Sequence, residues 1–187
     1  MIRRAFIALS LAAFAAPAGA QDAGDTLVIE VEGAANGTVQ IELLPDAAPL
    51  HVERLKTLAR EGAYDGVAFH RVIDGFMAQT GDVEHGTRDA FAAGRAGTGG
   101  SALPNLPAEF SDIPFDRGVV GMARAQDPNS ANSQFFIMFD EGYFLNGQYT
   151  VVGRVAEGME VVDQIQRGQG QSGAVPNPDY MASVTVQ

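Results

Sequence analysis

An arginine and a glutamine in a short predicted hairpin are the first residues whose types and spacing could do chemistry. Two apolar runs meet at Asp74-Gly75, a dipeptide typical of a tight two-strand turn. With a period of two, Arg71 lies on one face of the first strand, and Met77 and Gln79 share a face of the return strand. A cation, an amide and large apolar side chains can therefore converge on one small surface. The alternative is an edge-strand arginine in solvent beside an ordinary core hairpin.

A second amide lies on a distant apolar strand. Residues 133–139 are apolar on both faces, and the period of two places Gln134 on the same face as Phe136. An amide on that face is unusual for a pure core strand. The alternative is a buried glutamine whose polar atoms are satisfied by backbone groups.

Other motifs carry less chemistry. The run Gly97-Thr98-Gly99-Gly100 lacks the preceding strand and following helix that a phosphate-binding loop needs. Glu84 and His85 lack further metal ligands at sensible spacing, so segment 83–96 is interpreted as a solvated loop. The chain has no cysteine, which excludes disulfides, thiolate nucleophiles and cysteine zinc sites.

Residues 1–20 have the pattern of a signal peptide. A positive start at Arg3-Arg4 precedes an apolar segment at 5–16 and the small residues Ala18-Gly19-Ala20. An anchor that is never cut is the alternative. The paired arginines also resemble a twin-arginine export signal, but Ile2 and Ala8 fit it poorly, and export of the unfolded chain is favoured. We therefore expect a signal peptide at 1–20, a short lead at 21–25, one domain at 26–187 and an exported, periplasmic protein.

The acidic composition limits the partners. The 187 residues hold 12 Lys and Arg against 23 Asp and Glu, a net charge of −11. Without residues 1–20, which carry two arginines and no acid, 10 basic residues face 23 acidic ones, a net charge of −13. Such a field repels phosphate backbones and anionic lipid, so we expect neither nucleic-acid binding nor membrane binding after cleavage.

The remaining elements are mostly short strands with two helices. The alternating pattern predicts a hairpin around Asn36-Gly37, and further strands at 118–124, 150–155 and 181–186. Pro49 opens a helix with an apolar stripe, whose opposite side, including His51 and Arg54, is expected to be solvated. A second short helix begins near Met159. Many antiparallel strands with two isolated helices predict a closed or nearly closed β-barrel with the helices at its ends.

At this point the chain resembles the cyclophilin family of peptidyl-prolyl cis/trans isomerases. The motifs lie in the family's order across residues 26–187. They are the segments 69–73, 76–79, 81–82 and 97–100, followed by 122–123, 133–137, 152–155 and 158–159. The resemblance implies a mainly β fold, an eight-stranded antiparallel closed barrel capped by two α-helices, with no cofactor and no metal.

The resemblance also assigns roles to residues. Arg71 matches the family's catalytic arginine, and the apolar pocket for the substrate proline is matched by Phe76, Met77, Phe136 and Leu145. Further substrate-binding positions are Gln79, Ala123, Arg124, Gln134, Phe144 and Tyr149. A neighbouring secondary pocket is matched by Thr98 and Ala125.

Three departures qualify the resemblance. Phe144 stands where eukaryotic members commonly have tryptophan, and Tyr149 stands where the pocket rim usually has histidine. Both resemble the bacterial exported branch and predict weak cyclosporin binding. Arg124 replaces an asparagine that many members have, which adds a second cation near the cleft. The segment 83–96 is longer than in compact members.

The sequence thus predicts a monomeric enzyme that acts on proline-containing segments of unfolded or flexible polypeptides and assists folding after export. The rival interpretation is a binding module of the same fold, a chaperone or scaffold that grips proline segments without turnover. Arg71 favours the enzyme, because binding alone does not demand that cation. A hydrolase is disfavoured, because the sequence offers no nucleophile–base pair.

Overall fold

The computed structural model describes residues 24–92 and 94–187, so the expected signal peptide lies outside the described part. Two helices, α1 (Pro49–Arg60) and α2 (Met159–Val162), accompany two 3₁₀ turns, η1 (Pro128–Ser130) and η2 (Tyr143–Leu145). The strands are β1 (Thr26–Glu32), β2 (Gly37–Leu43), β3 (Val67–Ala68), β4 (Arg71–Ile73), β5 (Met77–Thr80), β6 (Val119–Met122), β7 (Phe135–Met138), β8 (Val151–Glu157) and β9 (Tyr180–Val186).

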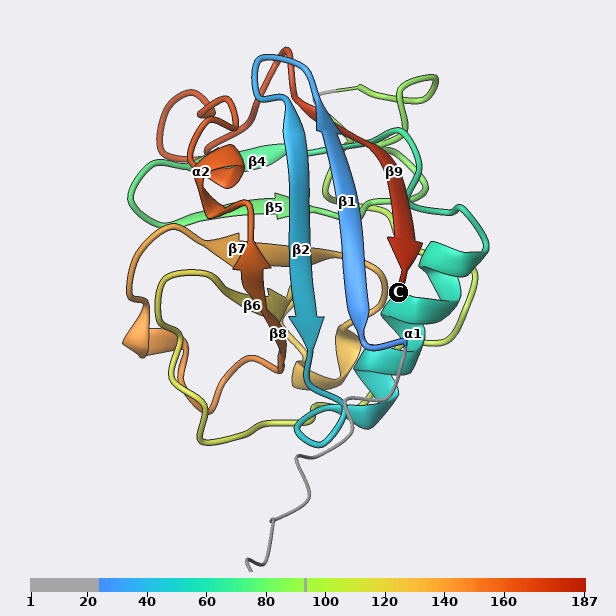
Figure 1. Ribbon diagram of the computed structural model, residues 1–187, viewed down its shortest axis with the longest axis vertical. Coiled ribbons are helices and arrows are strands. Elements are labelled where there is room, and N and C mark those ends of the chain that lie inside the picture. Colours follow the sequence, from blue (N-terminus) through green and yellow to red (C-terminus); the bar gives the residue numbers. More distant parts are fainter. Residues whose placement is uncertain (1–23, 93) are drawn as a thin grey trace, which may run out of the picture.

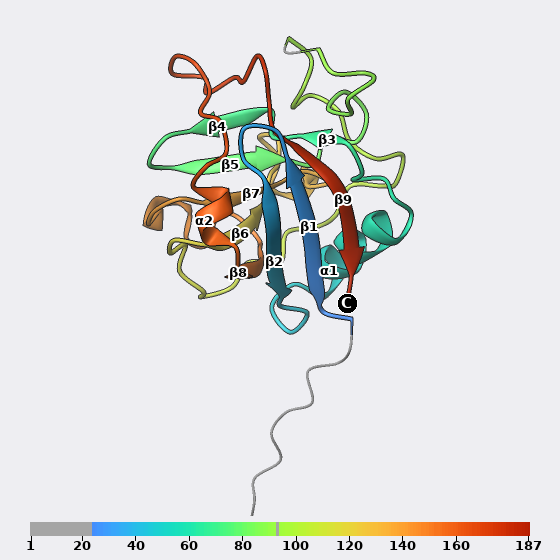
Figure 2. The same cartoon turned by 45° about the horizontal axis from the view of Figure 1, so that its top comes forward.

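The strands form one antiparallel sheet in the order β3-β9-β1-β2-β8-β6-β7-β5-β4. The sheet curls, so that β1, β2 and β9 run together on one side while β4, β5 and β7 cross behind them (Figure 1). Helix α1 lies beside β9, and the single turn of α2 packs against β2 (Figure 2). The predicted mainly β architecture with two helices is confirmed.

The prediction of a closed, eight-stranded barrel is wrong. The chain before the Asp74-Gly75 turn is divided into two short strands, because residues 67–68 pair with β9 whereas residues 71–73 pair with β5. The outer edge of β4 is instead met by the segment 168–175: Val72 donates to the carbonyl of Gly173 and accepts from the N–H of Gly168. A loop therefore occupies the edge that would have closed the barrel, which leaves a curled half-barrel of nine strands.

Helix α1 shows both a confirmed and a wrong prediction. Its apolar stripe is buried as expected, but His51 and Arg54, expected in solvent, are buried as well. The Nδ1 atom of His51 lies 2.6 Å from Glu109 Oε2, and Arg54 donates to the carbonyl oxygens of Pro104 and Asn132. The helical pattern could not show that a loop covers this side of the helix, because the groups that bind His51 and Arg54 lie some 50 or more residues further along the chain.

Two apolar clusters stabilise the molecule. The larger cluster joins buried residues of the sheet with the buried faces of both α1 and α2. The smaller cluster lies under the β5–β7–β6 surface and contains Met77, Phe115, Phe136, Met138 and Leu145. Because the smaller cluster reaches the surface, it can serve as the floor of a site. Within the described ranges, no helix has the length and apolar character needed to cross a bilayer.

Candidate active site

A cavity of about 290 Å³ opens above the smaller apolar cluster. Its walls contain Arg71 and nine of the ten residues predicted to bind substrate. They are Phe76, Met77, Gln79, Ala123, Arg124, Phe136, Phe144, Leu145 and Tyr149. The tenth, Gln134, lines an adjoining cavity instead. We call the first hollow the proline cavity, after the pocket for the substrate proline that the resemblance implies.

The antiparallel register brings the key side chains of the proline cavity together. Arg71 on β4 lies opposite Gln79 on β5, and Gln79 lies opposite Phe136 on β7. Residues directly opposite each other in such a pair place their side chains on the same face of the sheet. The hairpin between β4 and β5 is closed at Asp74-Gly75, where the positive φ of Gly75 (67°) suits a residue without a Cβ. The surface predicted from strand periodicity is therefore confirmed.

Stacked aromatic rings fix the floor of the proline cavity. Phe136 stacks on Phe115 with ring centroids 5.8 Å apart and meets Tyr149 edge-on at 5.9 Å. Gly121 lies beneath the two phenylalanines, where an added Cβ would stand 2.6 Å from an atom of each ring. Only a glycine lets the rings pack this closely over β6, so the floor is rigid. At the outer rim, Phe76 and the exposed Phe144 pack together at 5.5 Å.

Arg71 is held by a chain of hydrogen bonds. Its Nη1 donates to Gln79 Oε1 at 3.1 Å, and its Nε donates to the carbonyl of Ser172 at 3.1 Å. A guanidinium can only donate, so Gln79 turns its amide oxygen to Arg71 and uses its nitrogen for Gln134 Oε1 at 2.9 Å. Gln134 then donates to the carbonyl of Gly99 at 2.8 Å. These hydrogen bonds fix the guanidinium. Its Nη2 donates to no group of the described residues.

The surroundings of Arg71 favour a strong donor. Burial lowers the pKa of Arg71 from its ordinary value, while Tyr149 opposes the change. The side chain remains a cation at neutral pH, because an arginine starts from a pKa near 12 or above. A partly desolvated cation interacts more strongly with a developing lone pair than one in bulk water does. His70, the neighbour on the chain, is buried and lines neither cavity; burial lowers its pKa.

A second cavity of about 460 Å³ adjoins the proline cavity and shares Gln79, Ala123 and Arg124 with it. Thr98 and Ala125, predicted for a secondary pocket, both line this second cavity, as does Gln134. Its walls are mostly backbone and uncharged groups from segments 97–101, 123–125 and 130–134, joined by Gln79, Asn105 and the cation Arg124. This hollow is therefore suited to side chains that bring their own polar groups.

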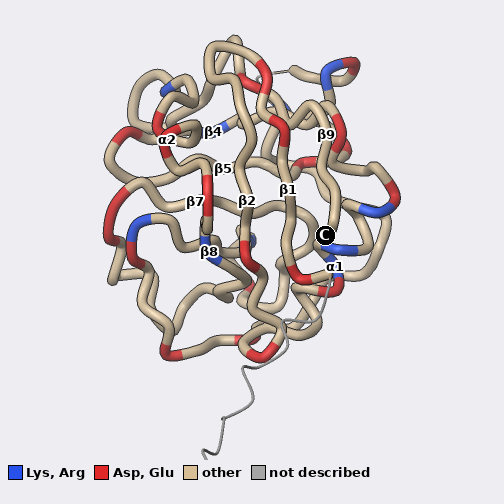
Figure 3. The backbone as a smooth tube through the Cα atoms, in the orientation of Figure 1, with Lys and Arg blue, Asp and Glu red and all other residues tan. Residues whose placement is uncertain are grey.

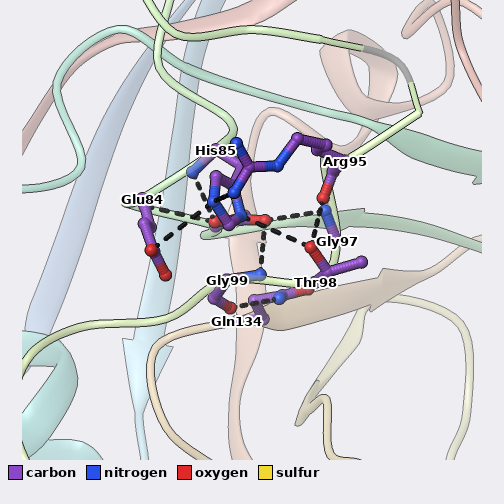
Figure 4. A network of polar contacts seen from close by, with 8 residues as sticks. Glu84, His85, Arg95, Gly97, Thr98, Gly99 and Gln134 are labelled. Carbon is purple, nitrogen blue, oxygen red and sulfur yellow. Dashed lines mark hydrogen bonds and ion pairs between the residues drawn. The ribbon is translucent and has the colours of Figure 1, made fainter.

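One buried carboxylate organises the loop beside the second cavity. Asp82 Oδ1 accepts from the backbone N–H groups of Glu84 and His85, and Oδ2 accepts from those of Gly97 at 2.7 Å and Gly99 at 3.0 Å. Figure 4 shows how this network ends at Gln134. Burial alone raises the pKa of Asp82, but the four N–H donors outweigh it and hold the pKa below its usual range. The start and end of segment 83–99 are thus tied together.

Sequence reasoning missed several supporting residues. Asp82 belongs to the motif at 81–82 but was predicted to have no role of its own; its position directly after a strand and a glycine is the feature that could have indicated one. The carbonyl of Ser172, which orients Arg71, lies in a segment that offered no periodic signal. Asn132 accepts from Ser101 N at 2.8 Å and braces the far wall of the second cavity. Among the residues described, no group of three or more His, Asp or Glu is placed to hold a metal ion.

With this geometry in hand, comparisons with known proteins define the class. Residues 26–186 match the family model described as cyclophilin type peptidyl-prolyl cis-trans isomerase/CLD. The chain belongs to this family, and it is an enzyme that interconverts the cis and trans forms of peptidyl-prolyl bonds.

Curated relatives and solved structures agree with this assignment. The chain is 59% identical over 185 residues to a probable peptidyl-prolyl cis-trans isomerase of Brucella suis, covering 98% of this chain and 92% of the relative. It is 38% identical to peptidyl-prolyl cis-trans isomerase B of Bacillus subtilis, covering 70% and 84%. A crystal structure of a cyclophilin from Hirschia baltica is similar with a TM-score of 0.72 and 29% identity, covering 88% and 74%. A Cryptosporidium parvum cyclophilin, crystallised in the presence of the dipeptide Ala-Pro, shares the fold with a TM-score of 0.73, 24% identity and coverage of 87% and 98%.

Proposed function

We propose that Arg71 is the catalytic residue and that the proline cavity receives the ring of the substrate proline. The observation that carries this proposal is the Arg71 guanidinium, which is fixed by Gln79 and Ser172 at the wall of an apolar cavity. In this arrangement the ring is held by Phe136 and its neighbours while the guanidinium faces the prolyl amide. The relative crystallised with Ala-Pro supports proline-containing peptides as the substrate class.

The chemistry requires no nucleophile and no proton transfer. Rotation about the peptide bond faces a barrier of about 18–20 kcal/mol, because the nitrogen lone pair is delocalised into the carbonyl. A guanidinium N–H that donates to the prolyl nitrogen stabilises the lone pair as it localises on that atom. The enzyme then binds the twisted amide better than either planar form. Lowering the barrier by about 7 kcal/mol accelerates rotation by roughly five powers of ten.

The cavity contributes orientation to the same step. A desolvated, preorganised donor aimed at developing charge is commonly worth a factor of about 10²–10³. Holding the ring on the rigid floor while the preceding carbonyl turns supplies part of the remainder. The hydrogen bonds from Arg71 to Gln79 and from Gln79 to Gln134 keep the guanidinium from rotating into solvent. The nearby Phe76, Met77 and Leu145 exclude water from the ring.

The biological setting is also a proposal. We infer that residues 1–20 are a signal peptide, that 21–25 are a short lead, and that the domain at 26–187 acts as a monomer in the periplasm on chains that fold after export. Phe144, at the position of a common family tryptophan, supports weak cyclosporin binding. N-terminal sequencing of the mature protein tests the cleavage: we expect Gln21 as the first residue, and an intact Met1 contradicts it.

The rival role is a proline-binding chaperone that needs no turnover. Exchange between cis and trans forms of a proline peptide, measured by NMR, separates the two. We expect the wild type to accelerate exchange, and Arg71→Ala to lower kcat/KM by about 10²-fold through loss of the charged donor. Arg71→Lys keeps the charge but loses the planar fork, so most of the loss should remain.

The matched control is Arg60→Ala, which removes an exposed arginine at the end of α1, outside both cavities. It should leave kcat/KM unchanged. Full activity of Arg71→Ala would contradict the catalytic role of this residue and favour simple binding.

A further inference from the structure

Arg124 lies at the border between the two cavities and lines both of them. The border is shared with Gln79 and Ala123, which carry no charge. A peptide whose proline ring fills the proline cavity must therefore pass Arg124 as it crosses to the second cavity. An extended chain advances about 3.3 Å per residue, so the crossing falls within one or two residues of the proline.

The guanidinium of Arg124 is fixed by neutral groups. Its Nε and Nη2 donate to the carbonyl of Gln148 at 3.2 and 3.0 Å, and its Nη1 donates to the carbonyls of Ala125 and Gln126 at 2.9 and 3.2 Å. Its Cζ lies 4.4 Å from the centroid of the Tyr149 ring. These bonds use four of the five N–H groups of the side chain. The fork is preorganised, so less side-chain entropy is lost when an anion binds to it.

The charge of Arg124 is not neutralised by a carboxylate of the described chain. Asp127, three residues further on, accepts from Asn129 N, and no ion pair joins it to Arg124. Ion pairs do neutralise most other cations of the described part. They are Lys56–Asp25, Arg60–Glu53, Arg88–Glu32, Arg117–Asp163, Arg154–Glu42 and Arg167–Asp74. Arg124 therefore retains an available positive charge.

The surroundings make this charge distinctive. The protein carries 23 acidic residues against 12 basic ones, and Figure 3 shows the acidic ones spread over many loops and strands. Among the described residues that line the two cavities, none is Asp or Glu, whereas Arg71 and Arg124 are both present. The cleft is thus a local positive region on an acidic protein. Like charges elsewhere on the surface suppress general binding of acidic chains, so selection must act locally at the cleft.

We infer that Arg124 selects proline segments that carry Asp or Glu within two residues of the proline. This inference rests on the proposed function, because it assumes that the ring occupies the proline cavity. The carboxylate of the substrate accepts a hydrogen bond from the remaining N–H of the Arg124 guanidinium and is attracted by its positive charge. A partly exposed ion pair is worth little, so the expected preference for Glu over Gln is about threefold in kcat/KM.

The experiment uses pairs of proline peptides that differ only by Glu against Gln at one position. Each of the two positions before the proline and the two positions after it is tested by NMR exchange. The quantity compared is the ratio of kcat/KM for Glu to that for Gln. We expect a ratio of about three at one position or more in the wild type, since this is the scale of an exposed charge pair.

Three variants test the origin of this ratio. Arg124→Gln should bring it to about one, and Arg124→Lys should keep part of it, because the charge remains while the stacked fork is lost. Arg60→Gln removes the same charge from the end of α1, outside both cavities, and should leave the ratio unchanged. A purely structural brace at Arg124 would change the rates for Glu and Gln peptides alike and leave the ratio unaltered.

Salt supplies a test that needs no variant. At about 1 M salt the screening length falls to about 3 Å, so the wild-type ratio should approach one. A ratio of one at every position at low salt, or an unchanged ratio in Arg124→Gln, overturns the inference. Failure of the proposed function has a different signature, because then the Gln peptides themselves show no acceleration.

Discussion

The two cavities share a border but are built in opposite ways. Four residues that line the proline cavity lie on paired strands, namely Arg71, Met77, Gln79 and Phe136, and its floor is a stack of aromatic rings. The walls of the second cavity are mostly loop segments, and the Asp82 carboxylate holds the one that contains Gly97 and Gly99. Cross-strand register positions the key groups of the first hollow, whereas hydrogen bonds to single side chains, Asp82 and Asn132, hold the loops of the second.

This difference explains a division of tasks. A rotation catalyst must hold its donor and the ring in one geometry, and strands with packed rings provide that rigidity. Residues on either side of the proline vary among substrates, and a loop wall of glycines and small polar groups accommodates them. The Gln79–Gln134 hydrogen bond joins the two hollows, because it connects Arg71 to the loop carbonyl of Gly99.

The largest expected effect comes from damage to the rigid hollow. Phe136→Ala removes the central ring of the floor, and buried Phe→Ala changes cost about 3–5 kcal/mol of unfolding free energy. We expect that loss in chemical denaturation, together with a severe fall in kcat/KM. Phe110→Ala, at an exposed ring outside both cavities, should change stability by about 0.5 kcal/mol or less. Near-normal activity in Phe136→Ala would mean that the ring does not hold the proline.

A smaller effect is expected from the loop wall. Asp82→Asn leaves an amide nitrogen facing backbone N–H donors, so about 2 kcal/mol of stability should be lost with the charge-assisted hydrogen bonds. Hydrogen exchange of the Gly97 and Gly99 amides should accelerate. Kcat/KM for a short Ala-Pro peptide should fall less than in Phe136→Ala.

Asp179 provides a matched control for Asp82. It is also fully buried, and it accepts from the backbone N–H groups of Ala35 and Gln166, outside both cavities. Asp179→Asn should lower stability similarly without faster exchange at Gly97 and Gly99. Equal rates of hydrogen exchange at Gly97 and Gly99 in the two variants would show that Asp82 does not stabilise the loop more than Asp179 does.

The connection between the hollows should have a modest effect. Gln79→Ala removes the amide between Arg71 and Gln134, at a cost of about 1 kcal/mol, which corresponds to about a fivefold fall in kcat/KM. The control is Gln40→Ala, which deletes an amide that donates to Glu157. Both residues lie outside the two cavities, so this change should not affect the rate. A loss above 10²-fold in Gln79→Ala would indicate that the amide itself contacts the substrate.

The smallest effect is expected from pH. The pKa of Asp82 is depressed in the folded state, so its contribution to stability is complete above the ordinary carboxyl range and is lost as the pH falls through the folded pKa. Wild type should therefore lose unfolding free energy more steeply on acidification than Asp82→Asn does. Parallel acid profiles in thermal denaturation would contradict this assignment.

Strand periodicity predicted much of the proline cavity. The alternation of Arg71, Met77 and Gln79 needed only the Asp74-Gly75 turn to fix which side chains share a face. The same rule placed Gln134 and Phe136 on one face, but it did not show that Gln134 would line the neighbouring hollow. Gln134 lies two residues before Phe136, so it reaches the second cavity, whose position depends on the loop that contains Gly99.

The periodicity of the sequence could not predict contacts between segments that lie far apart along the chain. The burial of His51 depends on Glu109, and the covering of the β4 edge by a loop depends on Gly173 meeting Val72. Loops 97–101 and 168–175 have no hydrophobic period, because their course is set by hydrogen bonds to single groups rather than by a buried face.

The sequence by itself determined which residue types carry the chemistry, an arginine and an amide among β-formers and aromatic residues, since local alternation settles the face of each strand. Only the tertiary structure decided how these groups are held. It brought the Ser172 carbonyl to Arg71, the Asp82 carboxylate to two distant glycines, and the Gln148 carbonyl to Arg124. These contacts join residues 15 or more positions apart along the chain, so no local pattern of the sequence can specify them.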